Sequence, residues 1–495
     1  MAQVYITTAI PYVNSKPHLG FALELVLADA LARSHRARGD DVRRCAGTDE
    51  NSLKNVLAAQ AAGEDVAPFV ARQAAEFEAL HTLLDLQVDD FVRTSADPRH
   101  RIAVEALWSA CLASGDLYRG HYEGLYCVGC EAFLGEHDLV AGQCPEHRAP
   151  PQHVREENWF FRLSRHGDAL RELILTRRLH IQPDHRRNEV LAQLDAGLHD
   201  FCVSRPSMRT AGWGIPVPDD PENRIYVWFD ALVNYLSGLG YPDTRDGTPF
   251  ARYWREARVV HVIGKGIARF HALYWPAMLL SAGVRVPDLL WIHGYATIEG
   301  GKISKSSGGN IAPATATALH GIDALRHFLL LHIGSEHDGD FASAALAHAY
   351  RHELADTLGN LCSRSLAMVQ RYCNGLPPGE TAATNEAERT LRQASARLVD
   401  EAHEALVRGS SRAAVDAVLS HARNLNAFVS DRTPWKLAAP ADARDELHAC
   451  LFTLLDGLRA IADALVSFMP QAAADLQRRT RAERVEAGLP LFPRT

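Results

Sequence analysis

The sequence predicts an α/β protein with a parallel sheet, followed by a long α-helical region. Three observations carry this prediction. A strand-like, a helix-like and a second strand-like segment follow one another within residues 4–50, a succession typical of parallel sheets. A second stretch of the same kind begins near Ile225. From about Ala312 to Ala482, Ala, Leu and Arg recur with helical spacing, and no segment there reads convincingly as a strand.

The first strand–helix–strand unit is defined by short local signals. Residues 4–10, VYITTAI, are rich in β-branched side chains and stop at Pro11, which indicates a buried strand. Residues 20–39 repeat apolar side chains at helical spacing and end in basic residues and Gly39, which predicts an amphipathic helix. Residues 41–50, DVRRCAGTDE, then predict a second strand with two acidic residues at its end.

The middle of the chain changes character near Tyr118. Gly and Cys become frequent there and long periodicity is lost, so we expect a small inserted module. After Ile225, RIYVWFDAL and RVVHVIGKG indicate a return to α/β structure, and ARFHALYWPAMLLSAG follows as a helix. LLWIHGYATIEGGKISKSSGGN adds another strand and a glycine-rich loop.

Length and composition narrow the class of protein. With 495 residues the chain is too long for a single core, so two or three domains are expected. No apolar run approaches the roughly 20 residues of a membrane span. The opening MAQVYITTAI lacks the basic segment of a secretory signal, so we expect a cytoplasmic protein whose thiols stay reduced. The net charge of −8 gives no global signature of nucleic-acid binding, although a local basic face could still bind phosphates.

A group of cysteines has the spacing of a zinc site. Cys127 and Cys130 form one pair, and Cys144 with His147 forms a second pair shortly afterwards. Three thiolates and one imidazole are a tetrahedral donor set that zinc prefers. Because four protein ligands leave no open position, we expect a structural Zn²⁺. The alternative is a group of buried cysteines.

Two further features suggest a site for a polyphosphate. Lys302 and Lys305 lie in the loop GGKISKSSGGN, whose glycines and two ammonium groups suit an anion with redistributing charge. The spacing is not that of a Walker loop, and a solvated basic turn is the alternative. His18 lies where the chain begins the first helix, whose N-terminus favours anions. Alone, it would be read as a cap or a surface group.

Together these motifs resemble a known family. PHLG after the first strand and KISKS after the last resemble the two signature motifs of class I aminoacyl-tRNA synthetases. ITTAIPYVNSKPHLG, GTDE, YEGLYCVGCE, YVWFDALVNY and FHALYWPAML extend the match, and the chain is similar to methionyl-tRNA synthetases over essentially its whole length.

The resemblance implies a Rossmann-type parallel-sheet catalytic domain with a zinc-bearing insertion, followed by an α-helical anticodon-binding domain. The implied segments are 1–116 for the first half of the catalytic domain, 117–224 for the connective insertion with the zinc knuckle, 225–335 for the second half with the KISKS loop, and 336–495 for the anticodon-binding domain.

The implied activity is ATP-dependent activation of methionine as an aminoacyl adenylate and its transfer to tRNA(Met). Mg²⁺ accompanies ATP, Zn²⁺ occupies the knuckle, and the chain is expected to be a monomer with no membrane partner. The catalytic residues implied are His18, Lys302 and Lys305. The ATP-binding residues implied are His18, Gly20, Lys302, Ser304, Lys305 and Ser306.

The methionine pocket implied by the resemblance comprises Ile10, Tyr12, Asp49, Trp228, Ala231, Tyr235, Ile267 and His271. Their chemistry agrees, because Asp49 can pair with the α-ammonium and the aromatic residues can wall a polarizable thioether. The anticodon readers implied are Asn360, Arg364 and Trp435. Without the surrounding match, Trp228 and Tyr235 would be read as core aromatics and Trp435 as a buried helix-junction residue.

Three departures from the family pattern cluster at the ATP and amino-acid site. Phe21 stands where the first motif has a second histidine, and Asn51 and Ser52 follow the acidic pair in place of His and Gly. Gly266 replaces an aspartate, although Arg205, the expected partner of that aspartate, is present. Two alternatives therefore stay open. One is a paralogue that transfers an activated amino acid to a small-molecule nucleophile in a specialised biosynthetic pathway. The other is a weakened protein that only binds tRNA or methionine.

Overall fold

The chain forms two compact units. The computed structural model describes residues 1–127, 132–135, 139–145, 148–298, 301–302, 312–485 and 487–494. The first unit comprises Met1–Pro17, Asp41–His81 and Val88–Ile292, and the second comprises His18–Asp40, Thr82–Gln87 and His293–Thr495. Among the described residues, no helix combines the length and the apolar character that crossing a membrane requires.

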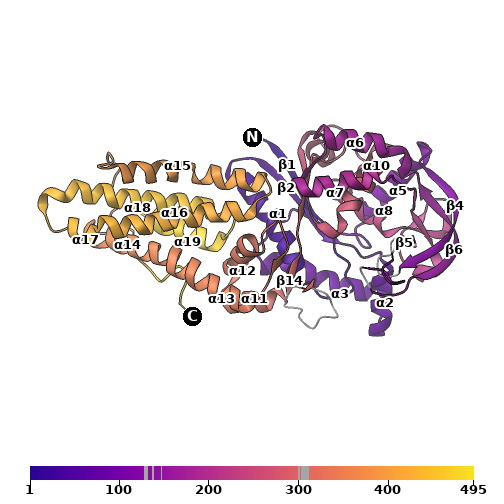
Figure 1. Ribbon diagram of the computed structural model, residues 1–495, viewed down its shortest axis with the longest axis horizontal. Helices are drawn as coiled ribbons and strands as arrows, with labels where there is room; N and C mark the ends of the chain where they lie inside the picture. Colours follow the sequence, from indigo (N-terminus) through magenta and orange to yellow (C-terminus); the bar gives the residue numbers. More distant parts are fainter. Residues whose placement is uncertain are drawn as a thin grey trace. The chain divides into compact units, whose positions relative to one another are not determined.

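A six-stranded sheet forms the centre of the first unit (Figure 1). Its strands, in spatial order, are β3 (Asp90–Arg93), β2 (Asp41–Thr48), β1 (Gln3–Thr8), β12 (Arg258–Gly264), β13 (Leu289–His293) and β7 (His180–Gln182). β1 pairs in parallel with both β2 and β12, β2 pairs in parallel with β3, and β13 pairs in parallel with β7. The prediction of a parallel sheet is confirmed. The central strand β1 is buried almost throughout, as its β-branched sequence requires.

Helices of the first unit enclose a large aromatic core. They are α2 (Leu53–Ala62), α3 (Val66–Glu78), α5 (Pro98–Ala113), α6 (Gly167–Leu175), α7 (Asp184–Asp195), α8 (Val227–Leu232), α9 (Asn234–Ser237) and α10 (Trp275–Ser281). Trp108 on α5 meets Phe229 on α8 edge to face, with ring centroids 5.3 Å apart. Trp254 and Trp275 pack in the same manner at 6.1 Å. These large, fully buried rings hold the short helices around the site against the sheet.

The segment after α5 forms its own antiparallel sheet. β4 (Leu117–Cys127) and β6 (Gln152–Phe161) pair along their whole shared length, as the long curved ribbons of Figure 1 show. The two short strands β5 (Ala132–Leu134) and β8 (Phe201–Cys202) flank this pair. A three-stranded sheet of β10 (Pro216–Val217), β11 (Asp220–Ile225) and β9 (Ser204–Pro206) follows. Among the described residues between β4 and β6 there is no helix that could form a parallel crossover, in keeping with the antiparallel pairing of these two strands.

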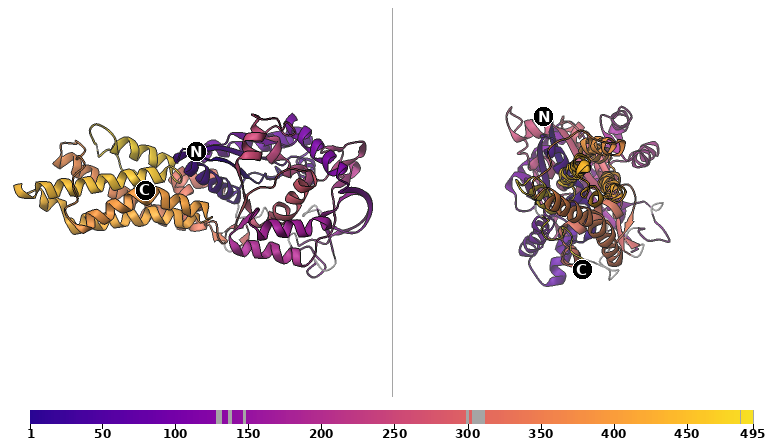
Figure 2. Two further views of the ribbon diagram at one scale, coloured as in Figure 1. Left: turned by 90° about the horizontal axis from the view of Figure 1, so that it is seen from above. Right: turned by 90° about the vertical axis from the view of Figure 1, so that its left-hand side faces the viewer.

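The second unit is almost entirely helical, as predicted for the C-terminal region. Its helices are α1 (Leu19–Ala37), α11 (Pro313–His320), α12 (Ile322–Phe328), η7 (Leu329–Ile333), α13 (Ser343–Ala349), η8 (Tyr350–Gly359), α14 (Asn360–Tyr372), α15 (Glu386–Val407), α16 (Ser411–Arg432), α17 (Pro434–Leu437), α18 (Arg444–Leu465) and α19 (Pro470–Thr480). Figures 1 and 2 show the long helices α15, α16 and α18 running side by side. A small sheet of β14 (Ala296–Ile298), β15 (Gly301–Lys302) and β16 (Gly339–Asp340) precedes them.

Helix α1 differs from the amphipathic helix that its sequence predicts. It is buried around most of its circumference, including the charged side chains of Glu24, Asp29 and Arg33. The reason is tertiary: within the second unit α1 contacts β14, α15 and η7. Asp29 is compensated by Arg33, whose Nε donates to its carboxylate at 2.7 Å, and by Arg326 at 2.8 Å. A helix surrounded on several sides keeps buried charges only when they are paired.

The two compact units do not coincide with the four segments inferred from the sequence. The second unit begins at His293 and includes α1, whereas the inferred helical domain begins at residue 336. β4 and β11 lie near the inferred limits of the insertion, at residues 117 and 224. The functional meaning of the four segments stays a prediction.

Candidate active site

Asp49 lies at the carboxyl end of β2, beside the residues that follow β1. Its backbone N–H donates to the carbonyl of Pro11 at 2.9 Å, and Tyr12 and Asp49 form a parallel bridge. Asn55, buried at the start of α2, donates from its amide to the Asp49 carbonyl at 2.9 Å. The Asp49 side chain is only 4% exposed. The structure thus brings two predicted pocket residues, Tyr12 and Asp49, together.

The side chain of the next acidic residue, Glu50, is bonded by other side chains of the protein. Its buried carboxylate accepts from Arg93 Nε at 2.8 Å and from the Thr48 hydroxyl at 2.8 Å, and Ser95 also contacts it. The indole of Trp213 donates to the Glu50 carbonyl at 2.8 Å. These protein groups account for the Glu50 carboxylate, whose role is therefore structural.

Asn51 and Ser52, two of the departures, have defined structural roles. The Asn51 amide donates to Asp230 at 2.7 Å, and the other oxygen of Asp230 lies 2.6 Å from Nε2 of His100. His100 in turn bonds Ser237 at 3.0 Å. Ser52 caps α2 by accepting from the backbone N–H three residues later. This buried network of Asn51, Asp230 and His100 was not foreseen, because its members are far apart in sequence.

Three other predicted pocket residues form one contact set. Nδ1 of His271 donates to the carbonyl of Ile267 at 3.0 Å, because a carbonyl can only accept. The proton of the neutral imidazole is therefore on Nδ1, and Tyr235 donates its hydroxyl proton to Nε2 at 2.7 Å. Burial lowers the pKa of His271 to about 4, so the ring is neutral near pH 7. The site thus contains a polar but uncharged Tyr235–His271 pair.

A second buried histidine, His261, supports this pair from the sheet. Its Nε2 accepts from the indole N–H of Trp275 at 3.2 Å, and Nδ1 lies 2.6 Å from the hydroxyl of Thr7. Its ring centroid is 4.3 Å from that of Tyr235. Burial, and then the nearby His271, hold the pKa of His261 well below its usual range. A lone histidine in the apolar strand RVVHVIG was the signal in the sequence that could have identified it.

Two of the remaining predicted pocket residues, Trp228 and Ala231, lie on α8. Trp228 on α8 stacks face to face on Phe270, with ring centroids 3.7 Å apart and an interplanar angle of 2°. Its indole nitrogen is buried and has no hydrogen-bond partner among the described residues. Ala231 is buried on the same helix. Ile10 lies against Gly47 of β2, where an added Cβ would meet its methyl carbon at 3.1 Å.

Arg205 lies between two aromatic rings. Its guanidinium is 4.1 Å from the ring centroid of Tyr226 and 5.4 Å from that of Tyr126. Its Nη1 donates to the Ser204 carbonyl at 2.7 Å. Arg205 and the two tyrosines, with Asn51 and Trp213, border a cavity of about 20 Å³. Gly266 has no acidic side chain, so the faces of aromatic rings and backbone carbonyls stabilise the buried Arg205 guanidinium.

His18, in the second unit, is the N-cap of α1. Its Nδ1 accepts from the Gly20 backbone N–H at 3.1 Å, so its imidazole proton is on Nε2. An added Cβ at Gly20 would meet His18 Cε1 at 2.9 Å, which explains the glycine. The Phe21 ring packs on the imidazole with centroids 4.4 Å apart. His18 therefore caps α1, as one of its readings from the sequence had it, and its Nε2 carries the imidazole proton.

Parts of the other predicted sites lie outside the described residues. Ser304, Lys305 and Ser306 are outside them, and Lys302 is described only as part of β15, opposite Thr297. Cys130 and His147 are likewise outside them. Cys127 ends β4, and Cys144 lies in a turn in which its carbonyl accepts from Arg148 at 2.8 Å. Both thiols are buried.

The predicted anticodon readers lie close together in the helical unit. Asn360 and Arg364 are one turn apart on α14, and the Arg364 guanidinium is 6.0 Å from the ring centroid of Trp435. Trp435 is 46% exposed, so its reading as a buried helix-junction residue is wrong. Thr433 adopts a left-handed backbone conformation just before Pro434, which ends α16 and turns the chain into α17. An exposed ring next to a guanidinium is suited to stacking.

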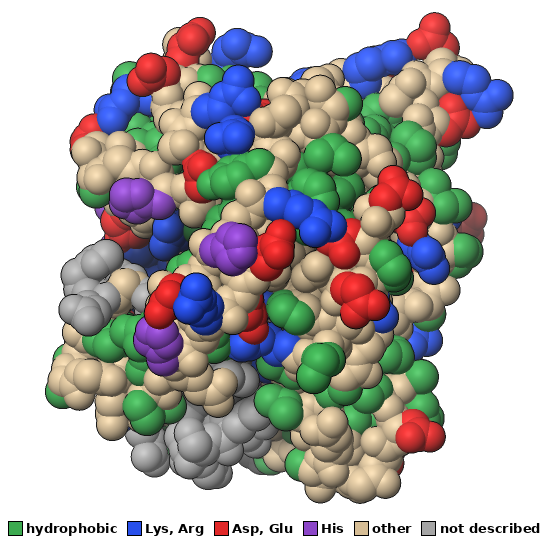
Figure 3. Space-filling model, turned by 90° about the vertical axis from the view of Figure 1, so that its right-hand side faces the viewer, with side chains coloured by type: hydrophobic (Ala, Val, Ile, Leu, Met, Phe, Trp, Pro, Cys, Tyr) green, Lys and Arg blue, Asp and Glu red, His purple; other side chains and the backbone are tan. Residues whose placement is uncertain are grey.

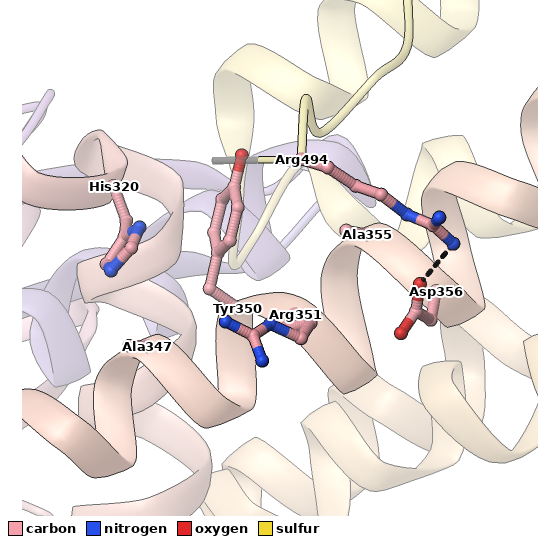
Figure 4. Close-up of a pocket in the computed structure, with 7 residues that line it drawn as sticks. All are labelled: His320, Ala347, Tyr350, Arg351, Ala355, Asp356 and Arg494. Atoms are coloured by element: carbon pink, nitrogen blue, oxygen red, sulfur yellow. Dashed lines mark hydrogen bonds and ion pairs between the residues drawn. The ribbon is translucent and has the colours of Figure 1, made fainter.

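One cavity in the helical unit contains none of the predicted site residues. It measures about 360 Å³ and lies in the helical unit (Figure 4). Its lining consists of His320, Ala347, Tyr350, Arg351, Ala355, Asp356 and Arg494. Arg494 pairs with Asp356 at 2.8 Å. On the face drawn in Figure 3, basic, acidic and hydrophobic side chains are interspersed, in keeping with the modest net charge of −8.

Comparison with known proteins identifies the class. The family model of class I tRNA synthetases (M) matches residues 4–153 and 148–366. Together with the parallel sheet, the helical C-terminal region and the site above, this match defines a class I aminoacyl-tRNA synthetase.

Individual relatives identify the family within the class. The methionine–tRNA ligase of Brucella suis biovar 1 is 37% identical over 476 residues, which are 95% of this chain and 90% of that protein. That of a Nostoc species is 38% identical over 478 residues, covering 95% and 88%. The structure of Mycobacterium tuberculosis methionyl-tRNA synthetase in complex with methionyl-adenylate has a TM-score of 0.94 and 34% identity, covering 100% of both chains. The chain belongs to the methionyl-tRNA synthetase family, as the sequence motifs predicted.

Proposed function

We propose that this chain is a methionine–tRNA ligase. It condenses methionine with the α-phosphate of ATP to form methionyl-adenylate and pyrophosphate, then transfers the methionyl group to the 3′ end of tRNA(Met). The observation that carries the proposal is that, in a member of this family, one compact unit holds both a buried acid, Asp49, and a neutral Tyr235–His271 pair. An acid for an ammonium, together with uncharged aromatic groups, suits an amino acid with an apolar, polarizable side chain.

In the proposed methionine pocket, the charged group is Asp49, which faces the charged α-ammonium of the substrate. Asp49 receives the α-ammonium, because Glu50 is already paired with Arg93. Tyr12, Trp228, Tyr235 and His271 surround the thioether, and Ile10, Ala231 and Ile267 complete the apolar lining. The neutrality of His271 matters, since an imidazolium beside a thioether would be a buried charge without a partner.

ATP is handled by groups at the start of α1 and in the KISKS loop. His18 would donate from Nε2 to a phosphate oxygen, because its Nδ1 is occupied by the Gly20 N–H. The N-terminus of α1 adds the positive end of its helix dipole. Lys302, Ser304, Lys305 and Ser306 would neutralise the departing pyrophosphate, and Mg²⁺ would be bound through the ATP phosphates.

Structural Zn²⁺ would be held by Cys127, Cys130, Cys144 and His147. The donor set fits zinc, and the burial of Cys127 and Cys144 is what a closed structural site needs. When bound, the ion would fasten the end of β4 to the turn at Cys144. It would take no direct part in the chemistry, because four protein ligands fill its tetrahedral shell.

Recognition of tRNA would use Trp435, Arg364 and Asn360 of the helical unit. Trp435 would stack with a splayed anticodon base, while Asn360 and Arg364 would bond to base edges. We propose that the protein acts as a monomer in the cytoplasm.

The test separates activation from transfer. ATP–pyrophosphate exchange is measured with each amino acid, and aminoacylation is then measured with tRNA(Met). We expect methionine to support exchange best and tRNA(Met) to be charged. Exchange without charging would favour the alternative in which a small-molecule nucleophile is the acceptor. No exchange with any amino acid would reduce the protein to a binder of tRNA or methionine.

A further inference from the structure

Three metal-ligating side chains meet in the helical unit, away from every site described above. Nε2 of His327 and Nε2 of His332 lie 2.6 Å and 2.9 Å from the same oxygen of Glu353. All three potential ligand atoms lie within 4.8 Å of one another. We propose that His327, His332 and Glu353 form a divalent transition-metal site for Zn²⁺, additional to the cysteine knuckle. The inference does not depend on the proposed enzymatic function.

Local backbone geometry explains how the two histidines meet. They are five residues apart, a spacing that an ordinary α-turn does not place on one face. The backbone from Leu329 to Ile333, η7, is a π-helix, whose wider turn accommodates that spacing. Their ring centroids are 6.1 Å apart and the rings are nearly perpendicular. Glu353 comes from a second π-helical segment, η8, so the cluster links two separate helical segments.

The donor set identifies the ligand chemistry. Two imidazole nitrogens and one carboxylate oxygen suit Zn²⁺ with a fourth, open position. Tetrahedral zinc with bonds of about 2.0–2.1 Å needs ligand atoms roughly 3.3 Å apart. The present separations of 2.6 and 2.9 Å would therefore open by less than about 1 Å. His332 and Glu353 are 36% and 20% exposed, so solvent can reach the open position while His327 is fully buried.

Binding the metal requires the lone pair of each Nε2. Glu353 now accepts N–H bonds, and a metal at each Nε2 would move the imidazole proton to Nδ1. Nδ1 of His327 is buried with no hydrogen-bond partner among the described residues, so its new proton would have no acceptor. This cost makes the site weaker than a closed knuckle of three thiolates and one imidazole.

Neighbouring charges lower the affinity further without blocking the site. Arg412 donates to the backbone carbonyl of His332 at 3.3 Å, and Arg423 is close enough to influence His327. Arg423 is partly neutralised by Asp416, whose carboxylate lies 3.3 Å from it. The single negative charge of Glu353 therefore does most of the compensation of a divalent ion. A metal here would join η7 to η8 and raise the stability of the helical unit by linkage.

The experiment uses the untagged full-length protein, stripped of metal and titrated with Zn²⁺. Wild type is expected to bind one more equivalent of Zn²⁺ than either His332→Gln or Glu353→Gln. Its melting temperature should rise as this additional equivalent binds. His352→Gln is the matched control, because His352 is an exposed histidine on the same segment and lies outside the cluster. Equal stoichiometry in wild type and both cluster variants overturns the proposal. Circular dichroism verifies that each variant is folded.

Cobalt separates this site from the cysteine knuckle. Co²⁺ bound by two imidazoles and a carboxylate gives visible bands without a sulfur-to-cobalt charge-transfer band, whereas thiolate ligands produce that band. In a Cys144→Ser variant whose histidine–glutamate cluster is unchanged, the sulfur-free spectrum should persist. It should disappear when Glu353→Gln is added to that variant. A spectrum in which every visible band scales with the sulfur band overturns the proposal, and the cluster is then a hydrogen-bonded clamp on Glu353.

Discussion

Asp49 and Glu50 are adjacent acidic residues with opposite roles. The Glu50 carboxylate is paired with Arg93, whereas the Asp49 backbone is bonded by the Pro11 carbonyl and the Asn55 side-chain amide. Changing Asp49 to Ala should lower methionine-dependent exchange by an amount equivalent to about 3–5 kcal/mol, because a buried ammonium would lose its charge partner. Asp243→Asn, in an exposed turn, should leave exchange unchanged. Comparable exchange in Asp49→Ala and wild type would contradict the assignment.

His271 gives the protein a defined pH dependence. In the unfolded chain the imidazole takes up its proton near pH 6.5, whereas in the folded chain burial delays protonation until about pH 4. The unfolded state therefore binds more protons between these values, and the stability from this residue is lost as the pH falls from 6.5 to 4.

His271→Gln should remove this contribution. The slope of unfolding free energy against pH should decrease in that window by up to about 1.4 kcal/mol per pH unit, the limit for one proton. Urea unfolding from pH 4 to pH 8 measures the slope, and His153→Gln, an exposed histidine on β6, serves as the control. An unchanged slope would mean that His271 is protonated alike in both states.

Phe21 lacks the hydrogen-bond donor that a histidine would provide at this position of the first motif. Its ring donates no hydrogen bond and packs on His18 at 4.4 Å. A histidine there would add a donor beside Nε2 of His18, so Phe21→His should raise the rate of adenylate formation, by up to about 10²-fold. Phe21→Leu keeps an apolar contact and should bring no gain. A reduced rate in Phe21→His would indicate that the site depends on the phenyl ring itself.

At the scale of elements, the interior of the helical unit is organised by a buried arginine. Arg326 on α12 pairs with Asp29 on α1 at 2.8 Å. It also donates to the carbonyls of Phe468 at 2.8 Å and Leu84 at 3.0 Å. One guanidinium thus satisfies groups from three separate parts of the second unit, which the planar fork of arginine allows.

Removing this guanidinium should be costly. Arg326→Met should destabilise the helical unit by about 3–5 kcal/mol, because the carboxylate and carbonyls would be left buried with fewer partners. The urea transition monitored by circular dichroism tests this. Arg408→Met removes an exposed ion pair with Glu404 and should cost less than about 1 kcal/mol. Equal effects of the two changes would show that the buried network is not stabilising.

At the scale of the whole molecule, activation and tRNA recognition draw on residues of different elements. The residues proposed for the methionine pocket belong to the sheet-based unit, whereas Trp435 and Arg364, proposed to read the anticodon, belong to α17 and α14 of the helical unit. Trp435→Ala should therefore weaken aminoacylation by an amount equivalent to about 1–3 kcal/mol, the value of one stacked base, and leave exchange intact. Leu376→Ala, an exposed apolar residue of the same unit, is the control. A parallel loss of exchange would show that the change disturbs the fold.

Short-range patterns were sufficient for the architecture. Alternation of strand-like and helix-like segments predicted the parallel sheet, and helical spacing predicted the C-terminal helices, because both patterns arise from neighbouring residues in one element. The predicted helix boundaries differ by a residue or two at α1, where the structure begins at Leu19 and ends at Ala37. The amphipathic character predicted for α1 was wrong, since its burial depends on helices and strands distant in sequence.

For the site, the sequence by itself determined the family and the residue types available, including Asp49, Tyr235 and His271. Only the tertiary structure decided that the Glu50 carboxylate bonds Arg93, which nitrogen of His271 carries the proton, and that Asn51 bonds Asp230. It also brought His327, His332 and Glu353 to a common point. The physical reason is that hydrogen bonds and desolvation depend on which side chains meet in space, and residues far apart in sequence carry no local signal of that meeting.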